Sequence, residues 1–381
     1  MNRILQNIKD IKGDKVIWAV VLLLCIVSTL AIYSSSASLT LKGGYFTTYF
    51  FKQIGMIIGS FIVIYLMHLV PIGWYRRIAF PALILSAVLL IATLLWGKSV
   101  HGARRELFGI ITADFAKIGL ILYLAMTMEK EKFHTFKNFA LKILLPSAVI
   151  FILIIIGSTS AALLLLMTVA LILFISGTNT RHLLKSAAIA VVILGLYVTD
   201  GYTTKVFPRS DTAVERLRKF FSDEDAVKER NTQADYAQIA VATGGIVGKG
   251  PGNSTQRYIL SQAYSDYIYA IIVEEYGLVG GGGLILLYLI LLYRAIIISR
   301  SCTRFFSILT VLGLVLSIVC QAILNMCVAV GLLPVTGQPL PLVSLGGSSL
   351  LAFSISLGIV LSVSRATDER IKSEKLKMEN E

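Results

Sequence analysis

The feature that most constrains this chain is a succession of apolar runs that approach 20 residues in length. A helix of about 20 residues crosses about 30 Å of hydrocarbon, whereas the strands of a membrane barrel are shorter and alternate apolar with polar side chains. The composition agrees, because 56% of the 381 residues are hydrophobic and only 15% are charged. A soluble domain cannot bury so much apolar surface. We therefore expect an all-α integral membrane protein.

Ten segments are expected to cross the membrane. In chain order they are residues 16–32, 51–69, 78–96, 111–128, 141–156, 159–175, 184–198, 266–298, 305–332 and 348–363. The eighth is too long for one straight crossing, and its glycines favour a bend or a division into two helices. A large loop at about 200–264 separates the seventh and eighth segments. We expect one polytopic domain over residues 1–366 and a charged tail over 367–381.

The basic residues predict the orientation of these segments. The formal net charge is +13, and the Lys and Arg residues lie mostly in short loops and tails, which is typical of topology signals rather than of a nucleic-acid interface. If the N-terminus is placed on the cytoplasmic side, every loop and tail on that side is basic. Both termini are then cytoplasmic and the long loop is outside. Lys98, Arg104 and Arg105 fall outside against this bias, so another reason for them is needed.

Two common alternatives find no support in the sequence. The four cysteines lie in apolar runs or a short basic loop, and neither they nor the four histidines have metal-ligand spacing. We predict packing residues or free thiols and no metal site. The first apolar run follows a basic stretch and lacks a small-residue cleavage site, so we expect a retained helix and not a signal peptide.

Asp266 stands at the outer mouth of the eighth apolar segment. An acid near the membrane boundary is costly unless it is used or paired, and as a general base it needs only hydrogen-bond reach to a hydroxyl. The alternative is a helix N-cap, for which Asp is a preferred residue.

Glu274 and Glu275 follow Asp266 two turns later on the same segment. Adjacent carboxylates point to different helix faces, so we expect one of them to pair with a neighbouring loop.

Two other polar sets interrupt the apolar pattern. Asp114 and Lys117 are three residues apart on the fourth segment, which predicts a buried ion pair or one wall of a polar cavity. Upstream, Arg104 and Arg105 lie in the outside connector, and paired guanidinium groups suit a diphosphate ligand.

Three irregular stretches complete the pattern. Residues 243–253 (TGGIVGKGPGN) hold five glycines and a lysine, which predicts either a backbone anion site or a flexible turn; the spacing is not that of a Walker loop. Residues 334–349 carry three prolines and predict a re-entrant loop lining a cavity, or a tight connector. Residues 213–221 in the long loop are amphipathic and suit a helix on the membrane surface, or a solvated connector.

Taken together, these stretches resemble the SEDS family of peptidoglycan glycosyltransferases, the FtsW, RodA and SpoVE group, over about residues 15–366. The resemblance is carried by GARR at 102–105, DFAK at 114–117, the glycine stretch at 245–256, SDYIYAIIVEEYGLVG at 265–280 and LPLVSLGGSS at 340–349. Each motif alone is weak, and their order is specific. Among the family members the SLGGSSL turn and the charged tail favour the FtsW type over the RodA type.

The resemblance implies site residues. Asp266 matches the essential acid of the family and is the expected catalytic base, Arg105 matches an outer-loop arginine, and Lys117 matches a buried lysine. Asp114 stands where the family usually has Glu. The residues that we expect to bind substrate are Arg104, Arg105, Asp114, Lys117, Gln238, Lys249, Asn253, Gln256, Ser344, Gly346, Gly347 and Ser348.

The chain also departs from the family pattern. Glu106 replaces a usual Trp, residues 112–114 replace Pro-Ser-Glu, and Gly157 replaces an acid or amide. Residues 261–264 replace the Pro-Glu-Ala-His lead-in to Asp266.

The implied function is polymerisation of lipid II by inverting glycosyl transfer at the outer face of the bacterial cytoplasmic membrane, with undecaprenyl diphosphate released. Implied partners are a class B penicillin-binding protein and membrane proteins of the divisome or the elongasome. The sequence leaves open whether the reaction requires a divalent cation, Mg²⁺ or Mn²⁺. A lipid II flippase and a non-catalytic scaffold are the alternatives, and polymerisation that depends on Asp266 would separate them.

Overall fold

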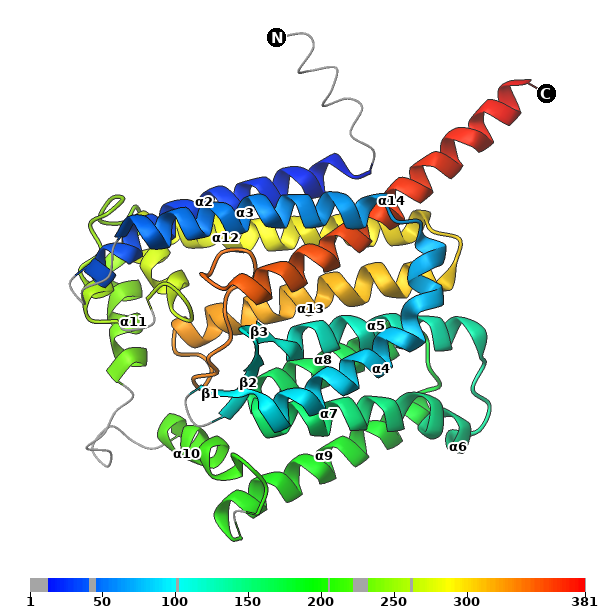
Figure 1. Cartoon of the computed structure of the whole chain (residues 1–381), viewed down its shortest axis with the longest axis horizontal. Coiled ribbons are helices and arrows are strands. Elements are labelled where there is room, and N and C mark those ends of the chain that lie inside the picture. Colours follow the sequence, from blue (N-terminus) through cyan, green and yellow to red (C-terminus); the bar gives the residue numbers. More distant parts are fainter. Residues whose placement is uncertain are drawn as a thin grey trace.

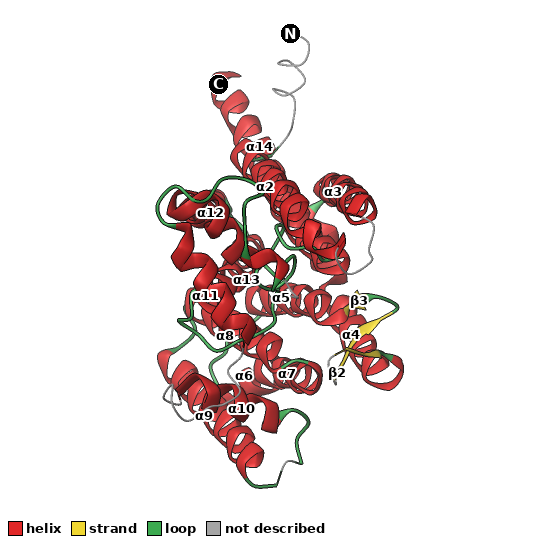
Figure 2. Ribbon diagram, turned by 90° about the vertical axis from the view of Figure 1, so that its left-hand side faces the viewer, coloured by secondary structure: helices red, strands yellow, loops and turns green. Residues whose placement is uncertain are grey.

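The computed structural model describes residues 13–40, 46–100, 103–204, 206–221, 232–260 and 263–380. Most of its long helices run in similar directions through one bundle (Figure 1), which Figure 2 shows from one end. The first half of the bundle consists of α2 (Lys15–Thr40), α3 (Phe46–Leu69), α4 (Ile72–Trp96), α5 (Thr112–Lys130), α6 (Phe136–Phe139), a π-helical turn (Ala140–Leu144), α7 (Leu145–Gly157), α8 (Thr159–Ile175) and α9 (Thr180–Tyr202).

The second half begins with the elements of the predicted long loop. These are α10 (Ser210–Phe221), α11 (Thr232–Gly244) and a 3-10 turn (Gln256–Tyr258). They are followed by α12 (Ile268–Ser301), α13 (Phe305–Ala329) and α14 (Gly347–Asn380). The amphipathic stretch at 213–221 is therefore helical, with Val214 buried and Phe221 exposed. Its place on a membrane surface stays a prediction.

A helix occupies each of the ten predicted segments. Within the described residues, 8 helices are long and apolar enough to cross a membrane. The chain is therefore a multi-pass membrane protein. Helix α8 is shorter, at 17 residues, and α5 carries four charged side chains, Asp114, Lys117, Glu129 and Lys130. The number of ten crossings accordingly stays a prediction.

A small antiparallel sheet corrects the all-α prediction. Strands β1 (Lys98–Val100), β2 (Ala103–Leu107) and β3 (Ile110–Ile111) pair in the order β1-β2-β3. Leu107 pairs with Ile110 across a two-residue turn, in which Phe108 has φ 51° and Gly109 has φ 79°. Two positive φ angles in a two-residue turn suit the twist of a hairpin. The sheet fixes Arg104 and Arg105 beside the start of α5.

Helix α5 lies in the core of the bundle. Every residue from Ala116 to Met128 is buried, and Gly119 lies so close to α4 that a Cβ would be 2.4 Å from the hydroxyl oxygen of Ser86. Helix α13 packs on α5 in the same way, because a Cβ on Gly313 would be 2.8 Å from a methyl carbon of Ile121. Close packing of this kind is typical of helix contacts inside a bilayer. It places the charged start of α5 inside the protein.

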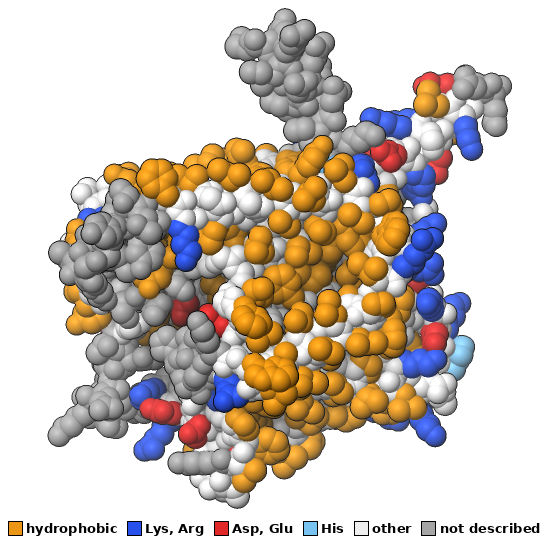
Figure 3. All heavy atoms as spheres, in the orientation of Figure 1, with side chains coloured by type: hydrophobic (Ala, Val, Ile, Leu, Met, Phe, Trp, Pro, Cys, Tyr) orange, Lys and Arg blue, Asp and Glu red, His pale blue; other side chains and the backbone are white. Residues whose placement is uncertain are grey.

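The two ends of the bundle differ in charge. Figure 3 shows apolar side chains across the face of the bundle and Lys and Arg gathered at the edge from which the C-terminal helix leaves. At that end Asp14 pairs with Arg294, and Arg365 donates to the Leu69 carbonyl. The first described residues, beside Asp14, and the last part of α14 therefore lie at one basic end (Figure 1). The boundary predicted at 366/367 falls inside α14, which continues as one helix through the charged tail.

Helix α12 is divided at Gly277, as its glycines predicted. Gly277 has φ 66° and ψ −166°, which are not helical. Residues 245–250 satisfy the backbone at the break, since Lys249 N donates to the Glu274 carbonyl at 3.0 Å and Leu278 N donates to the Gly245 carbonyl at 2.9 Å. The first part of α12, which follows Asp266, is therefore a separate short helix held by a loop.

Candidate active site

The segment between α13 and α14 has irregular backbone and forms one wall of the site. Ser344 Oγ accepts from Leu340 N at 2.8 Å and donates to the Ser265 carbonyl at 2.6 Å. Leu345 N donates to the Tyr264 carbonyl at 2.9 Å. These bonds hold the segment against the two residues that precede Asp266. The predicted cavity-lining loop is observed, and the predicted residue Ser344 positions the chain next to the acid.

Asp266 lies just before α12 and does not cap it. The N-cap residue is Tyr267, and it makes no side-chain cap bond. The backbone carbonyl of Asp266 accepts a hydrogen bond from Asn325 Nδ2 at 2.8 Å, and the carboxylate oxygen Oδ1 of Asp266 accepts one from Ser265 Oγ at 2.8 Å. Its Oδ2 faces Gly337, where a Cβ would stand 3.4 Å away. The side chain is half-buried. The N-cap alternative is therefore wrong, and the carboxylate is positioned by its backbone and by Ser265.

Asp114 and Lys117 form the predicted ion pair and also border a cavity. Lys117 Nζ lies 2.8 Å from Asp114 Oδ1, and both side chains are almost fully buried. Lys117 also donates to Gln321 Oε1 at 2.9 Å, and Ser349 Oγ donates to Asp114 Oδ2 at 2.7 Å. Gln321 in turn donates to the Pro339 carbonyl at 3.1 Å. A buried pair needs such additional hydrogen bonds to offset its desolvation.

A cavity of about 590 Å³, a volume that includes space open to solvent, lies between these elements. We call it the ion-pair cavity. Its polar lining is Thr93, Arg104, Arg105, Thr112, Asp114, Ser158, Gln338 and Ser349. Asp114 thus forms part of the cavity wall, so both interpretations of the 114/117 pair hold together.

The two predicted arginines do different things beside this cavity. One terminal nitrogen of Arg104, Nη1, lies 2.7 Å from the carbonyls of both Leu94 and Leu95 at the end of α4. Arg105 Nε donates to the Gly157 carbonyl at 3.0 Å. Burial first, and then Arg209 and Arg216, lower the pKa of Arg105 to about 10, while the Asp266 charge opposes that shift. Arg105 therefore remains a cation at neutral pH.

Gly157 has a structural reason to lack a side chain. It ends α7, and a Cβ at this position would lie 3.0 Å from the Arg104 carbonyl oxygen. The carbonyl of Gly157 accepts from Arg105 Nε at 3.0 Å and from Arg209 Nη1 at 2.9 Å. The small residue thus lets the sheet and both guanidinium groups approach the end of α7.

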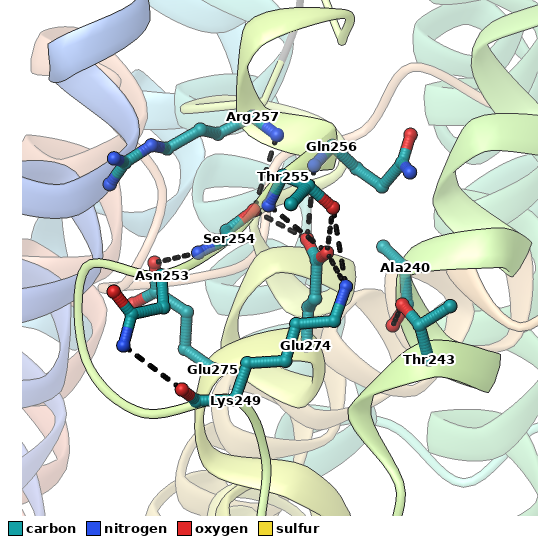
Figure 4. Close-up of polar contacts among 10 residues, drawn as sticks. All are labelled: Ala240, Thr243, Lys249, Asn253, Ser254, Thr255, Gln256, Arg257, Glu274 and Glu275. Carbon is teal, nitrogen blue, oxygen red and sulfur yellow. Dashed lines mark hydrogen bonds and ion pairs between the residues drawn. The ribbon is translucent and has the colours of Figure 1, made fainter.

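The predicted residues Lys249 and Asn253 belong to a second polar cluster. Figure 4 shows Lys249, Ser254 and Thr255 gathered around Glu274. Lys249 Nζ lies 2.6 Å from Glu274 Oε1, and Thr255 Oγ1 donates to the same oxygen at 2.8 Å. Asn253 Nδ2 donates to the Lys249 carbonyl at 3.0 Å. The expectation that one of Glu274 and Glu275 pairs with a loop is thereby observed.

This cluster corrects the anion-site interpretation of residues 243–253. The N–H groups of Lys249 and Gly250 already donate to the carbonyls of Glu274 and Glu275, at 3.0 and 2.9 Å. They are not available to a phosphate. None of Lys249, Asn253 and Gln256 lines the ion-pair cavity. The loop instead braces the break in α12.

The remaining predicted residues lie at the edges of the site. Ser348 Oγ accepts from Ile111 N at 3.1 Å, which links α14 to the sheet. Gly347 begins α14 beside Met56, and Gly346 precedes it. Gln238 on α11 is exposed and lies against Gly331. Substrate contact by these four residues stays a prediction, and Gly102, Ser261 and Gln262 of the quoted motifs lie outside the described residues.

Sequence reasoning missed several side chains that the fold brings to the site. Gln321 and Asn325 stand one turn apart on α13, and this spacing of two amides in an apolar helix is a signal that could have found them. Arg209 and Arg216 lie near Arg105 and could have been found as further basic residues on the outside. Ser349, not Ser348, contacts Asp114.

Within the part of the chain that the structure describes, no group of three or more His, Cys, Asp or Glu side chains could hold a metal ion. Among the described residues, Asp114, which is paired with Lys117, is the carboxylate that lines the cavity, and Asp266 lies beside its lining residue Gly337.

Comparison with known proteins gives consistent matches over almost the whole chain. A family model described as cell cycle protein FTSW_RODA_SPOVE matches residues 14–369. A protein of Halothiobacillus neapolitanus named probable peptidoglycan glycosyltransferase FtsW is 30% identical, over 94% of this chain and 89% of its own length. A protein of the same name from Saccharophagus degradans is 31% identical, over 93% and 92%.

Solved structures share the fold. A chain of the structure described as "Structural coordination of polymerization and crosslinking by a peptidoglycan synthase complex" matches with a TM-score of 0.75 and 25% identity, over 94% of this chain and 99% of that one. The rod shape determining protein RodA of Thermus thermophilus matches with a TM-score of 0.68 and 23% identity over the same shares.

Proposed function

The chain belongs to the FtsW/RodA/SpoVE family of cell cycle proteins, and on that premise we propose that it is a peptidoglycan glycosyltransferase of cell wall synthesis. The curated relatives above carry that activity in their names. The reaction that fits the site is polymerisation of lipid II, a sugar linked through diphosphate to a polyprenyl chain. The observation that carries the proposal is the position of the Asp266 carboxylate, which is half-buried and lies beside Gly337, a residue that lines the ion-pair cavity together with Arg105.

In this mechanism Asp266 acts as the general base. The 4-hydroxyl of the acceptor sugar attacks the anomeric carbon of the donor, and the bond from that carbon to the diphosphate oxygen breaks. Asp266 takes the hydroxyl proton as the new bond forms. The anomeric configuration inverts because attack and departure are on opposite faces. The electron pair of the broken bond leaves with undecaprenyl diphosphate.

The cations of the site stabilise the departing group. Arg105, Arg104 and Asp114 line the ion-pair cavity, and Lys117 pairs with Asp114. Positive groups fixed where charge develops lower the barrier without reorganising during the reaction. Ser265 and Asn325 keep Asp266 in place through its Oδ1 and its carbonyl.

A cation requirement is a separate part of the proposal. Diphosphate oxygens bind Mg²⁺ or Mn²⁺ readily, so the substrate would bring the cation to a site that offers few carboxylates of its own. Lipid II polymerisation in EDTA, followed by titration of Mg²⁺ or Mn²⁺, measures this requirement directly.

The cellular setting follows the FtsW names of the relatives. We propose a role in cell division, in the bacterial cytoplasmic membrane, with both termini cytoplasmic and the site on the outer side. The basic end of the bundle would then face the cytoplasm, and the sheet with Arg104 and Arg105 would face outward. A class B penicillin-binding protein and other divisome proteins are the proposed partners. A RodA-type role in elongation is the alternative, and localisation of the tagged protein to the septum or the side wall decides it.

A lipid II flippase is the rival from another class, and detergent micelles separate the two. In micelles no bilayer separates two compartments, so transport of lipid II cannot occur. A polymerase still forms glycan strands there. We expect the purified full-length chain, alone or with a class B penicillin-binding protein, to polymerise lipid II in detergent. Lipid II movement across proteoliposomes without polymer in micelles would overturn the proposal in favour of transport. The absence of both would favour a scaffold.

A further inference from the structure

The hairpin of β2 and β3 ends in a turn with an unusual residue at its first central position. Both central residues of such a turn have positive φ, and Asn, Asp or Gly is normally found at the first of them. Here the first is Phe108, with φ 51°, and only the second is a glycine. A bulky side chain rarely adopts this conformation. Because Phe108 is 91% exposed, packing inside the protein does not offset the strain.

The register of the sheet brings the end of α4 to the tip of this hairpin. Lys98 pairs with Glu106 across β1 and β2, and a Cβ on Gly97 would lie 3.0 Å from the Glu106 carbonyl oxygen. Glu106 stands two residues before Phe108 in the chain. Trp96, which precedes Gly97, therefore lies at the end of the sheet that carries Phe108.

The side chains around the turn are apolar and exposed as well. Trp96 is 75% exposed, and Leu95 and Ile110 are also exposed. A group of large apolar side chains on the surface is typical of a site that contacts a partner or a membrane. Trp in particular is enriched at the boundary between membrane and water, where its ring lies among the lipid headgroups. The composition of the tip therefore favours a membrane boundary.

One side of α4 is exposed from the middle of the helix to this tip. Ile84, Val88, Ile91 and Leu95 are each about half exposed, and their spacing of three or four residues places them on one face. Helix α4 is long and apolar enough to span a membrane, so this face contacts lipid. In Figure 2 the turn between β2 and β3 lies at the perimeter of the bundle, next to α4. The tip thus continues a lipid-facing surface beyond the end of the helix.

The hairpin is also tied to α4, which fixes its height relative to the bilayer. Arg104 of β2 donates through Nη1 to the carbonyls of Leu94 and Leu95, both at 2.7 Å. Arg105, the next residue of the same strand, lines the ion-pair cavity. A contact that holds the tip therefore also holds the strand that brings Arg105 to the site.

We propose that the tip of the β2–β3 hairpin is a membrane anchor, with Phe108 and Trp96 among the lipid headgroups of the leaflet that lies away from the basic end of the bundle (Figures 1 and 3). The partner is the phospholipid bilayer, and the contact does not depend on the proposed enzymatic activity. Transfer of the Phe108 ring from water to the lipid boundary offsets the strain of the turn. The headgroup region is hydrated, so the tip stays within reach of water-soluble reagents.

Depth-dependent fluorescence quenching in liposomes that contain the purified full-length chain tests the position of the tip. In a variant lacking the four native cysteines, a thiol-reactive fluorophore is attached after Phe108→Cys, Ile84→Cys or Asn253→Cys. Ile84 is at the middle of α4, and Asn253 is exposed in the loop before α12. The liposomes contain phosphatidylcholine with a nitroxide quencher either at the headgroup or deep in the acyl chain.

We expect the label at Phe108 to be quenched most by the headgroup nitroxide. The label at Ile84 should be quenched most by the deep nitroxide, and the label at Asn253 by neither. No quenching at Phe108 would overturn the proposal and leave the tip as a contact for another protein. Strongest quenching there by the deep nitroxide would also overturn it, because the tip would then lie in the hydrocarbon.

Hydrogen exchange of the amides of residues 103–111 in nanodiscs tests whether the native ring is the anchor. Phe108→Gln keeps the strain of the turn and removes the apolar ring, whereas Phe108→Trp keeps an aromatic ring. We expect Phe108→Gln to exchange about tenfold faster than the wild type, the effect of losing the burial of one large apolar side chain. Phe108→Trp should exchange like the wild type.

The matched control for this exchange measurement is Val247→Gln. Val247 is another highly exposed apolar residue, and it lies outside the hairpin in the loop that braces α12. This variant should leave the exchange of the hairpin unchanged. Wild-type exchange in Phe108→Gln would overturn the anchor, because a ring that is exposed to water on all sides can be replaced without loss.

Discussion

Asp266 shows how a single side chain acquires its chemistry from the segments around it. From the sequence alone the acid suited a helix cap as well as a base, and only the structure separates the two, since Tyr267 occupies the cap position. The partners that hold the acid come from distant segments, Asn325 on α13 and Gly337 after it. No local pattern around position 266 contains these contacts.

Lys117 allows a prediction on stability at the same scale. Its ammonium is buried and paired with Asp114. Lys117→Met should lower the free energy of unfolding by about 3–5 kcal/mol, because it leaves a buried carboxylate without its partner. Thermal or denaturant unfolding in detergent measures the change.

The control for that prediction is Lys142→Met, which breaks the pair with Glu131 at the surface, where the two side chains are 49% and 37% exposed. Its cost should stay below about 1 kcal/mol, as for other exposed ion pairs. Adding Asp114→Asn to Lys117→Met should recover part of the loss. Equal costs at the two lysines would argue against a buried pair.

At the scale of elements, the break in α12 was predictable and the loop that braces it was not. Glycines in an overlong apolar helix indicate a bend, and Gly277 provides it. The loop that braces the break consists of residues 245–250, whose backbone lies close to the backbone of α12. A Cβ at Gly248 would lie 2.2 Å from the Glu275 carbonyl oxygen. The sequence showed the glycines but not which backbone they approach, so an anion site was an open alternative there.

Gly277→Ala should destabilise the protein strongly. The alanine would have to adopt φ 66°, and its Cβ would stand 2.2 Å from the Ile246 carbonyl oxygen. We expect a loss of about 2–4 kcal/mol in unfolding free energy. Gly282→Ala is the matched control in the same helix, because nothing lies within 4 Å of its Cβ position. It should be neutral or stabilising by about 0.5–1 kcal/mol. Similar stability of the two variants would contradict the described break.

The sheet at residues 98–111 is the element that sequence patterns did not reveal. Its strands are short, with two to five residues each, and too brief for an alternating pattern to show. Its position between α4 and α5 matters, because it holds Arg104 and Arg105 at the cavity. The arginines were predicted from their charge, from their position against the positive-inside bias and, for Arg105, from the family resemblance, whereas their placement comes from the hairpin.

At the scale of the whole molecule, hydrophobicity was sufficient to locate the helices but not the cavities. Apolar run length placed a helix at each predicted span, because crossing hydrocarbon imposes that length on any sequence. The cavities arise where α7 gives way to α8 and where residues 334–339 lie against that break. Contacts of this kind depend on packing between segments that are far apart in the chain. For that reason Arg209 and Arg216 were missed while Arg105 was found.

The proposed orientation can be tested by cysteine labelling in cells. In a variant lacking the four native cysteines, Phe108→Cys would place a thiol at the hairpin tip, where Phe108 is 91% exposed. A membrane-impermeant maleimide should label it in intact cells. His134→Cys, exposed in the loop between α5 and α6, should be labelled only after the cells are opened. The reverse pattern would invert the topology and place the site on the cytoplasmic side.

The central claim is that Asp266 removes the acceptor proton, and the rate of lipid II polymerisation by purified Asp266→Asn tests it most directly. The amide keeps the shape of the side chain but cannot take a proton, so we expect the rate to fall by about 10²-fold or more. Binding of undecaprenyl diphosphate, measured on the same protein, should persist. Asp235→Asn, which changes another acid in the same loop region, should polymerise like the wild type. Glycan strands formed by Asp266→Asn at the wild-type rate would contradict the account.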